Sequence, residues 1–203
     1  MIPKRPSTLV RLSVVAAALA LALTGCTAAT SLQQQWKTGD TKNYISGDGT
    51  ITEIEPADRK QPVEFTATTD EDASISRSTY EGKVVVLNFW YASCPPCRVE
   101  APDLESLSKK YADQGVQFIG VNVRDEKDTA RAFARSFKMT YPSVVDSGNA
   151  TVQLALAGAR GSANATPTTI VLDKKGRVAS SILGEADKGV LNTLISDTLA
   201  EKN

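Results

Sequence analysis

The chain has 203 residues, 41% of them hydrophobic, which suits a single domain with its own core. It carries 23 basic and 23 acidic side chains without a basic block, so a nucleic-acid partner is not expected. The absence of histidine excludes Ser-His-Asp and Cys-His catalysis, and it excludes a haem or metal held by imidazole.

Residues 1–25 have the pattern of a targeting segment. A basic start precedes the apolar run 14–23, which is too short to span a membrane well. The run leads into Leu-Thr-Gly-Cys at residues 23–26, which resembles a bacterial lipobox, where the cysteine is lipidated and becomes the first residue. We therefore expect a lipoprotein signal peptide and a lipid on Cys26 that anchors the protein to the outer face of the cell membrane. An ordinary signal peptide with an accidental cysteine is the alternative.

The next segment, residues 26–60, is rich in small and polar side chains and predicts a tether that becomes ordered near residues 49–54. Residues 61–203 alternate between strand and helix patterns and form the predicted domain. The expected strands are 63–67, 84–89, 116–123, 168–172 and 178–183, and the expected helices are 101–111, 128–137 and 188–200, with a short apolar-faced segment at 146–157. This order predicts an α/β fold in which helices flank a central mixed β-sheet, with an N-terminal β extension.

Cys94 and Cys97 lie where the apolar run 84–89 gives way to helical spacing. Residues at i and i+3 of a helix are about 5–6 Å apart, and a disulfide needs Cα atoms about 4.4–6.8 Å apart, so the pair can open and close. Cys94 would stand at the helix N-terminus, where free N–H groups and the helix dipole favour a thiolate. We expect thiol–disulfide exchange with Cys94 as the attacking thiol and Cys97, one turn inside and better shielded, as the resolving thiol.

The cysteine pair has two other interpretations. A zinc site needs four ligands, but the chain has three cysteines and no histidine, and Cys26 is assigned to the lipid. A purely structural disulfide stays open, although a disulfide stabilises a short loop less than a long one. No metal and no cofactor are expected.

Several motifs are shared with a known family. They are residues 82–90, Cys-Pro-Pro-Cys-Arg at 94–98, Glu100, Pro102, residues 115–123, Thr-Pro-Thr at 166–168 and residues 173–178. In combination they resemble the TlpA/ResA-like extracytoplasmic branch of the thioredoxin superfamily, and the resemblance covers residues 62–200. The lipobox and residues 123–125 look most like actinobacterial members associated with cytochrome c maturation.

This resemblance implies a thioredoxin-like fold and a redox-active disulfide between Cys94 and Cys97. It also implies a cis bond before Pro167, facing the redox pair, and a Thr166 that pairs with substrate backbone; an ordinary trans turn is the alternative. Glu100 would lie near the thiols and tune them, unless it is a solvated glutamate favoured by the helix dipole.

Three neighbouring positions refine the prediction. Trp90 is interpreted as a core and rim aromatic that supports the site. Asn88 stands where cytoplasmic thioredoxins have a buried acid, so the proton relay of that acid is not available. Ser93 precedes the first cysteine, where the family commonly has Trp, and this leaves the choice of partner open.

The expected function is a membrane-anchored extracytoplasmic thiol–disulfide oxidoreductase. It would reduce disulfides in partner proteins such as apocytochrome c and take its electrons from a membrane thiol carrier of the CcdA type. The insert at 95–96 lacks the histidine of strongly oxidising relatives, and Arg98 is expected to point to solvent, so a reducing potential is predicted. The alternatives are an oxidant or isomerase for secreted proteins, a peroxidase, and a non-catalytic lipoprotein binding module.

Overall fold

The computed structural model of the protein describes residues 51–157 and 165–202. The expected signal peptide, the lipidation site Cys26 and the tether up to residue 50 lie outside the described residues. None of the described helices is long and apolar enough to cross a membrane.

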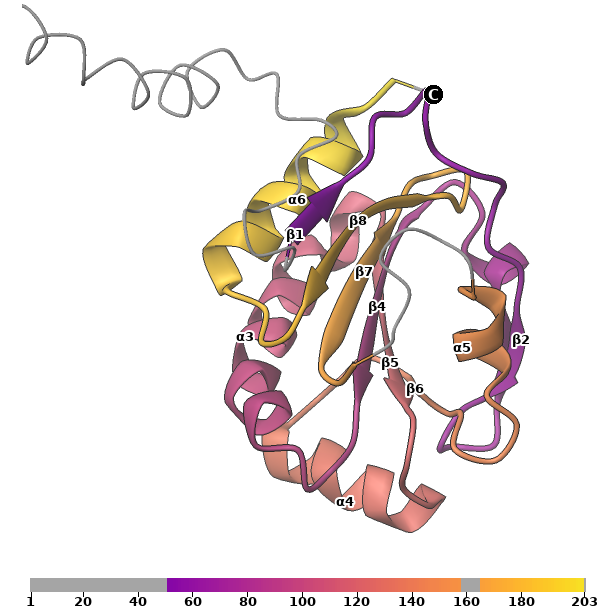
Figure 1. Cartoon of the computed structure of the whole chain (residues 1–203). Helices are drawn as coiled ribbons and strands as arrows, with labels where there is room; N and C mark the ends of the chain where they lie inside the picture. Colours follow the sequence, from indigo (N-terminus) through magenta and orange to yellow (C-terminus); the bar gives the residue numbers. More distant parts are fainter. Residues whose placement is uncertain (1–50, 158–164, 203) are drawn as a thin grey trace, which may run out of the picture. The chain divides into compact units, whose positions relative to one another are not determined.

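A six-stranded mixed sheet forms the centre of the fold, with the strand order β1-β8-β7-β4-β5-β6 (Figure 1). β4, β5 and β6 are parallel, whereas β4 with β7, β7 with β8, and β8 with β1 are antiparallel pairs. The strands are β1 (Ile51–Glu53), β4 (Val84–Trp90), β5 (Val116–Asn122), β6 (Ser143–Val145), β7 (Thr168–Leu172) and β8 (Val178–Leu183). A small second sheet pairs β2 (Thr66–Thr68) with β3 (Ser74–Ser76).

Both faces of the large sheet are covered (Figure 1). The helical elements are η1 (Arg77–Tyr80), α3 (Pro95–Tyr111), η2 (Ala112–Gln114), α4 (Lys127–Phe137), α5 (Thr151–Ala155) and α6 (Lys188–Ala200). α3 and α6 lie against one face, and α5 and β2 against the other. This arrangement confirms the predicted mixed sheet flanked by helices.

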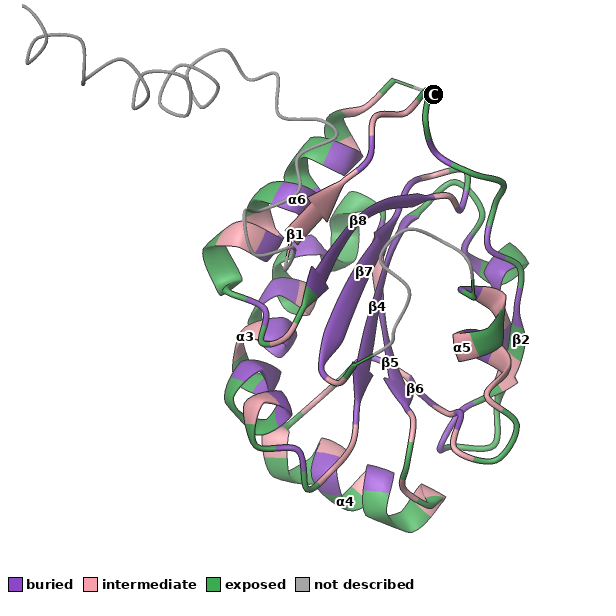
Figure 2. Cartoon of the chain, viewed as in Figure 1, coloured by how far each residue is buried: buried purple, intermediate pink, exposed green. Residues whose placement is uncertain are grey.

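The central strand β4 shows why the sheet needs both layers. Successive side chains of a strand point to opposite faces. Val84 and Val86 pack in the cluster of α3 and α6, whereas Val85, Leu87 and Phe89 pack in the cluster on the other side. All seven residues of β4 are buried, as the purple ribbon in Figure 2 shows. Six of them are apolar and Asn88 is the polar one, so the strand is nearly continuous in apolar character rather than alternating.

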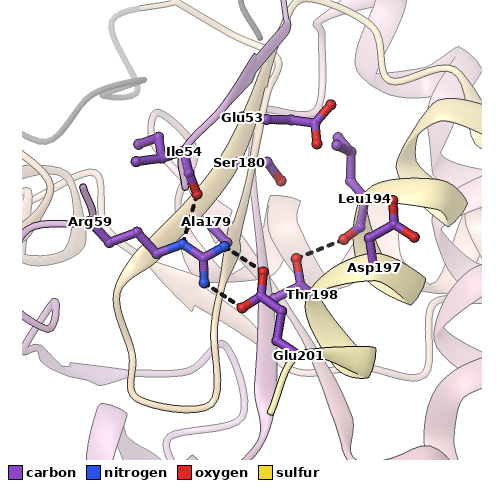
Figure 3. Close-up of a pocket in the computed structure, with 9 residues that line it drawn as sticks. All are labelled: Glu53, Ile54, Arg59, Ala179, Ser180, Leu194, Asp197, Thr198 and Glu201. Atoms are coloured by element: carbon purple, nitrogen blue, oxygen red, sulfur yellow. Dashed lines mark hydrogen bonds and ion pairs between the residues drawn. The ribbon is translucent and has the colours of Figure 1, made fainter. Parts of the chain in front are cut away.

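An ion network fixes the segment after β1. The Arg59 guanidinium donates to both carboxylate oxygens of Glu201 at 2.6 Å, and its Nε donates to the Ile54 carbonyl at 2.9 Å (Figure 3). Arg59 also donates to Asp173 at 3.0 Å, and Arg177 Nε donates to the same carboxylate at 2.9 Å. Because Asp173 begins the β7–β8 turn and Glu201 follows α6, the network joins the start of the described chain to its end.

Most predicted elements are present near their expected bounds, but three differ. The helix expected at 101–111 begins earlier, at Pro95. The strand expected at 63–67 is wrong, because only residues 66–68 pair as β2. Val63 and Phe65 are instead buried in the core, and the Val63 N–H bonds to the Gly176 carbonyl at 2.8 Å.

The segment expected at 146–157 also differs from the prediction. α5 covers only residues 151–155, and the Asp146 carboxylate accepts from the N–H groups of Val152 and Gln153 at its start, both at 3.0 Å. β6, immediately before, has no predicted counterpart. With only three residues, this edge strand is too short to give a periodic signal.

Candidate active site

Cys94 and Cys97 form a disulfide where β4 leads into α3. The S–S distance is 2.13 Å, the Cβ–S–S–Cβ dihedral angle is 75° and the Cα atoms are 5.3 Å apart. Cys94 is the N-cap of α3, and its sulfur accepts the backbone N–H of Cys97 at 3.3 Å. Pro95 and Pro96 fill the first turn, where their missing N–H groups cost little.

The expected difference in shielding between the two thiols is wrong for this disulfide state. Cys94 is 1% exposed and Cys97 is 2% exposed, so both are buried. Trp90 of β4 and Phe133 of α4 belong to the cluster that covers them. What separates the two sulfurs is the helix end, because only Cys94 occupies the cap position and receives a backbone N–H.

The Thr166–Pro167 peptide bond is cis. This loop leads directly into β7, whose residue Thr168 pairs with Phe89 near the end of β4. The loop and the redox pair therefore lie at the same end of the sheet. Pro167 is buried and Thr166 is partly exposed, and the Pro167 carbonyl accepts the N–H of Gly184 at 2.9 Å.

Glu100 is buried in the structure, so its interpretation as a solvated glutamate is wrong. Its side chain lies three residues after Cys97 on α3, and the residue is 2% exposed. Oε1 accepts from the Asn88 amide at 2.8 Å and Oε2 accepts the backbone N–H of Ala186 at 2.8 Å. Burial raises the pKa of Glu100 from 4.5 to about 7, and the two hydrogen bonds oppose that rise.

Asn88 is a site residue that sequence reasoning underestimated. It was expected only to lack the relay of a buried acid, but its amide holds Glu100 and also donates to Thr169 Oγ1 at 3.1 Å. The signal was present in the sequence, because a polar side chain inside a fully buried strand must find hydrogen-bond partners.

Trp90 is 1% exposed and lies in the core beside the disulfide. Its Nε1 donates to Ser143 Oγ at 3.2 Å, and its ring centroid is 4.3 Å from that of Phe133. The contact depends on Gly120, because a Cβ there would lie 2.7 Å from Ser143 Oγ and 2.8 Å from Trp90 Nε1.

Two side chains hold Ala92 in the turn before Cys94. Asp125 Oδ2 accepts the Ala92 N–H at 2.6 Å, a contact that sequence reasoning missed. Arg98 Nη1 donates to the Ala92 carbonyl at 3.2 Å, and its guanidinium carbon is 5.1 Å from the Phe137 ring centroid. Arg98 is exposed, but it lies over the protein surface rather than extending into solvent as expected. Within the described ranges, no group of three or more His, Cys, Asp or Glu side chains could hold a metal.

The cysteine pair lies at the N-terminus of the helix after the central strand, and the cis-proline loop lies at the same end of the mixed sheet. This combination defines the thioredoxin-like thiol–disulfide oxidoreductases. The Redoxin family matches residues 55–195 of this chain. The chain belongs to this family, and within it is a ResA/TlpA-like member.

The relatives agree with this assignment. The thiol-disulfide oxidoreductase ResA of Halalkalibacterium halodurans is 36% identical over 119 residues, which are 59% of this chain and 64% of that relative, just under two thirds of its length. ResA of Bacillus cereus is 30% identical over 64% of this chain and 71% of its own.

Two solved structures share the fold closely. A DsbF homologue from Corynebacterium diphtheriae is 32% identical, with a TM-score of 0.66, and the match covers 77% of this chain and 98% of that one. A secreted thiol-disulfide isomerase from Corynebacterium glutamicum is 31% identical, with a TM-score of 0.68, and the match covers 78% of this chain and 98% of that one. These likenesses confirm the thioredoxin-like fold expected from the sequence.

Proposed function

We propose that this protein reduces disulfides in extracytoplasmic partner proteins, among them apocytochrome c. The observation that carries the proposal is the Cys94–Cys97 disulfide at the N-terminus of α3. That position supplies a thiolate with a backbone N–H and the positive end of the helix dipole once the pair is reduced.

The reaction begins from the dithiol. The Cys94 thiolate attacks one sulfur of the substrate disulfide, a mixed disulfide forms, and the other substrate sulfur leaves as a thiolate that takes a proton. Cys97 then loses its proton and attacks Cys94, so that the Cys94–Cys97 bond forms and the second substrate sulfur leaves. Two electrons pass to the substrate, and a membrane thiol carrier of the CcdA type restores the dithiol.

Three further residues have roles in this scheme. Glu100 takes the Cys97 proton, because a buried carboxyl with a pKa of about 7 can both accept and return a proton near neutral pH. Thr166 offers its backbone to the substrate chain, and Pro167, which has no N–H, leaves the approach to the sulfurs open. Trp90 packs against the pair and keeps it rigid.

The proposed location rests on residues outside the described ranges. Residues 1–25 act as a lipoprotein signal peptide, Cys26 carries the lipid, residues 26–60 act as tether and linker, and residues 61–203 carry the redox domain. The C. glutamicum structure, which is described as secreted, supports a place outside the cytoplasm. Cys26→Ala should release the protein from the membrane fraction, with soluble insulin-reducing activity kept; an unchanged membrane fraction and mature mass would reject the anchor.

A second direction of electron flow has its own support. The two corynebacterial structures are named as an isomerase and as a DsbF homologue, and each match covers nearly all of that chain. On this alternative the Cys94–Cys97 disulfide oxidises or rearranges secreted proteins. The chemistry of each exchange step is the same, and the reduction potential decides its direction.

The midpoint potential in glutathione redox buffers separates the two directions. We expect a value nearer that of thioredoxin, about −270 mV, because no histidine in the cysteine insert stabilises the thiolate further. A value above roughly −150 mV would overturn the reductase assignment and favour the oxidant. The matched substrate test uses an oxidised Cys-x-x-Cys-His peptide, the haem-attachment sequence of c-type cytochromes, which the dithiol should reduce.

A further inference from the structure

A buried chain of hydrogen bonds links β7, β4 and α3 next to the redox pair. Asn88 Nδ2 on β4 donates one hydrogen to Thr169 Oγ1 at 3.1 Å and the other to Glu100 Oε1 at 2.8 Å. Asn88, Thr169 and Glu100 are 3%, 0% and 2% exposed. Groups so deeply buried depend on each other for hydrogen bonds.

The contact with Ala186 decides which oxygen of Glu100 can carry a proton. The backbone N–H of Ala186 donates to Oε2 at 2.8 Å, and a backbone N–H can only donate. A proton on Oε2 would therefore set two hydrogens against each other. The proton belongs on Oε1, but there it meets the NH₂ group of Asn88, which is also a donor.

An amide can satisfy both protonation states, because its two ends are complementary. The NH₂ group offers two hydrogens and the carbonyl oxygen offers two lone pairs. Rotation of the amide by half a turn exchanges them in nearly the same space. The Thr169 hydroxyl suits both orientations, since it can accept a hydrogen bond or donate one.

We propose that Asn88 is a positioning residue for Glu100 and works by inverting its amide. Its NH₂ group holds the ionised carboxylate, and its carbonyl oxygen holds the protonated acid, with the Thr169 hydroxyl as the second partner in both states. The inference rests on the proposed function in one respect: the proton comes from Cys97. In that step the Cys97 S–H bond breaks, an O–H bond forms on Glu100, and the thiolate electron pair attacks the mixed disulfide.

The charged and titratable groups around Glu100 do not take over the role of the Asn88 amide. Glu185, in the loop before α6, brings a negative charge that favours the protonated acid. The Tyr141 hydroxyl, from the loop before β6, is buried without a hydrogen-bond partner among the described residues, and burial raises its pKa, so it stays neutral. On α6, Lys188 lies at the surface, where it pairs with Asp103 at 3.0 Å rather than with Glu100.

The direct test is neutron crystallography of the deuterated wild-type disulfide form at about pH 5 and about pH 9, on either side of the Glu100 pKa of about 7. We expect the Asn88 deuterium atoms to face Glu100 and Thr169 at high pH. At low pH the Asn88 oxygen should face the Glu100 O–D and Thr169 O–D groups. The same amide orientation at both pH values would overturn the proposal.

A variant series tests the same idea in solution, with the ¹³Cδ resonance of Glu100 as the readout. Asn88→Leu removes a donor that the ionised carboxylate needs more than the neutral acid does, so the Glu100 pKa should rise by roughly one unit. Ser143→Ala is the control, because its buried hydroxyl serves Trp90 instead and the Glu100 titration should not move. An unchanged Glu100 pKa in folded Asn88→Leu would reject the role of Asn88.

These measurements are independent of the proposed function. Both use the disulfide form without a substrate, so they report on the amide even if the protein proves to be an oxidant. Conversely, wild-type protein that inverts its amide but fails to reduce insulin would remove the proposed function and leave the inference standing.

Discussion

The two ends of the sheet both bury charge, but they do so in opposite ways. At the β7–β8 turn, Asp173 and Glu201 surround Arg59. Burial would raise the pKa of Asp173, but hydrogen bonds from the Arg177 backbone and from the Arg59 and Arg177 side chains lower it overall. At the redox end, Glu100 takes its hydrogen bonds from two neutral donors, and burial raises its pKa to about 7. Asp173 therefore stays ionised near neutral pH, whereas the Glu100 carboxyl at the redox end can change its charge.

The difference teaches what makes a buried carboxyl chemically useful. A carboxylate beside a guanidinium stays ionised over the whole neutral range and serves the fold. A carboxylate that has only neutral donors is stabilised too little to stay ionised, so a proton can come and go. Position alone does not separate the two, because Asp173 and Glu100 are 3% and 2% exposed.

The largest expected effect removes the chemistry at the redox end altogether. Cys94→Ser should abolish reduction of insulin disulfides, because the attacking thiolate is lost. Cys97→Ser should instead accumulate mixed disulfides through Cys94, which non-reducing electrophoresis and mass spectrometry would detect. Equal trapping by both variants would reject the assignment of attacking and resolving roles.

At the other end, Arg59→Leu should lower the free energy of unfolding by roughly 3 kcal/mol, because Glu201 loses the buried guanidinium and Asp173 keeps, among the described residues, only its ion pair with Arg177. Urea denaturation measures this, and the midpoint potential should be unchanged. The control is Lys188→Ala, which breaks the exposed pair with Asp103 and should cost less than about 1 kcal/mol. A shifted potential in Arg59→Leu would show that the two ends are coupled.

The pH dependence of stability should have opposite signs at the two ends. Burial raises the pKa of Glu100 from 4.5 to about 7, so its stabilising contribution is full below pH 4.5 and is lost as the pH rises to 7. The amount is roughly 3 kcal/mol, and Glu100→Gln should abolish it in denaturation curves measured across this window. Asp173, whose pKa is lowered, should lose its contribution only as the pH falls below about 4. A pH profile that Glu100→Gln leaves unchanged would contradict the contrast.

The smallest effect sharpens the comparison within the redox end. Asp125→Ala removes the acceptor for the Ala92 N–H and should cost about 1 kcal/mol. Hydrogen exchange at the Ala92 amide should quicken several-fold. Arg98→Ala is the control, because Arg98 contacts the carbonyl of Ala92 and not its N–H. An unchanged exchange rate in Asp125→Ala would show that another contact holds the turn.

The sequence predicted the parts of this molecule that depend on local spacing. The strand before Cys94, the cysteine pair and the helix at 188–200 follow from apolar periodicity and from a known motif. The polar Asn88 in a buried strand indicated that a hydrogen-bond partner was needed, but spacing could not identify Glu100 as that partner. The second partner of Glu100, the backbone of Ala186, lies far along the chain and leaves no signal in the sequence. The sequence did not predict the contact between Asp125 and Ala92 either, because these residues are also far apart along the chain. The strand prediction at 63–67 was wrong because Val63 and Phe65 alternate with polar residues as in a strand. Their side chains are buried in the core, but their backbone does not pair with another strand.

Among the described residues, the two edges of the large sheet are β1 and β6, and β6 is only three residues long. Exposed edge strands are templates on which another extended chain can pair, and short edges limit that. Val144 of β6 is moreover bridged by Thr69. The proposed substrates are cysteine-bearing chains that have not yet folded, which are the molecules most inclined to add a strand. At this short and bridged edge, the protein offers unfolded substrates little backbone to pair with, so it can exchange disulfides with them without becoming a template for their aggregation.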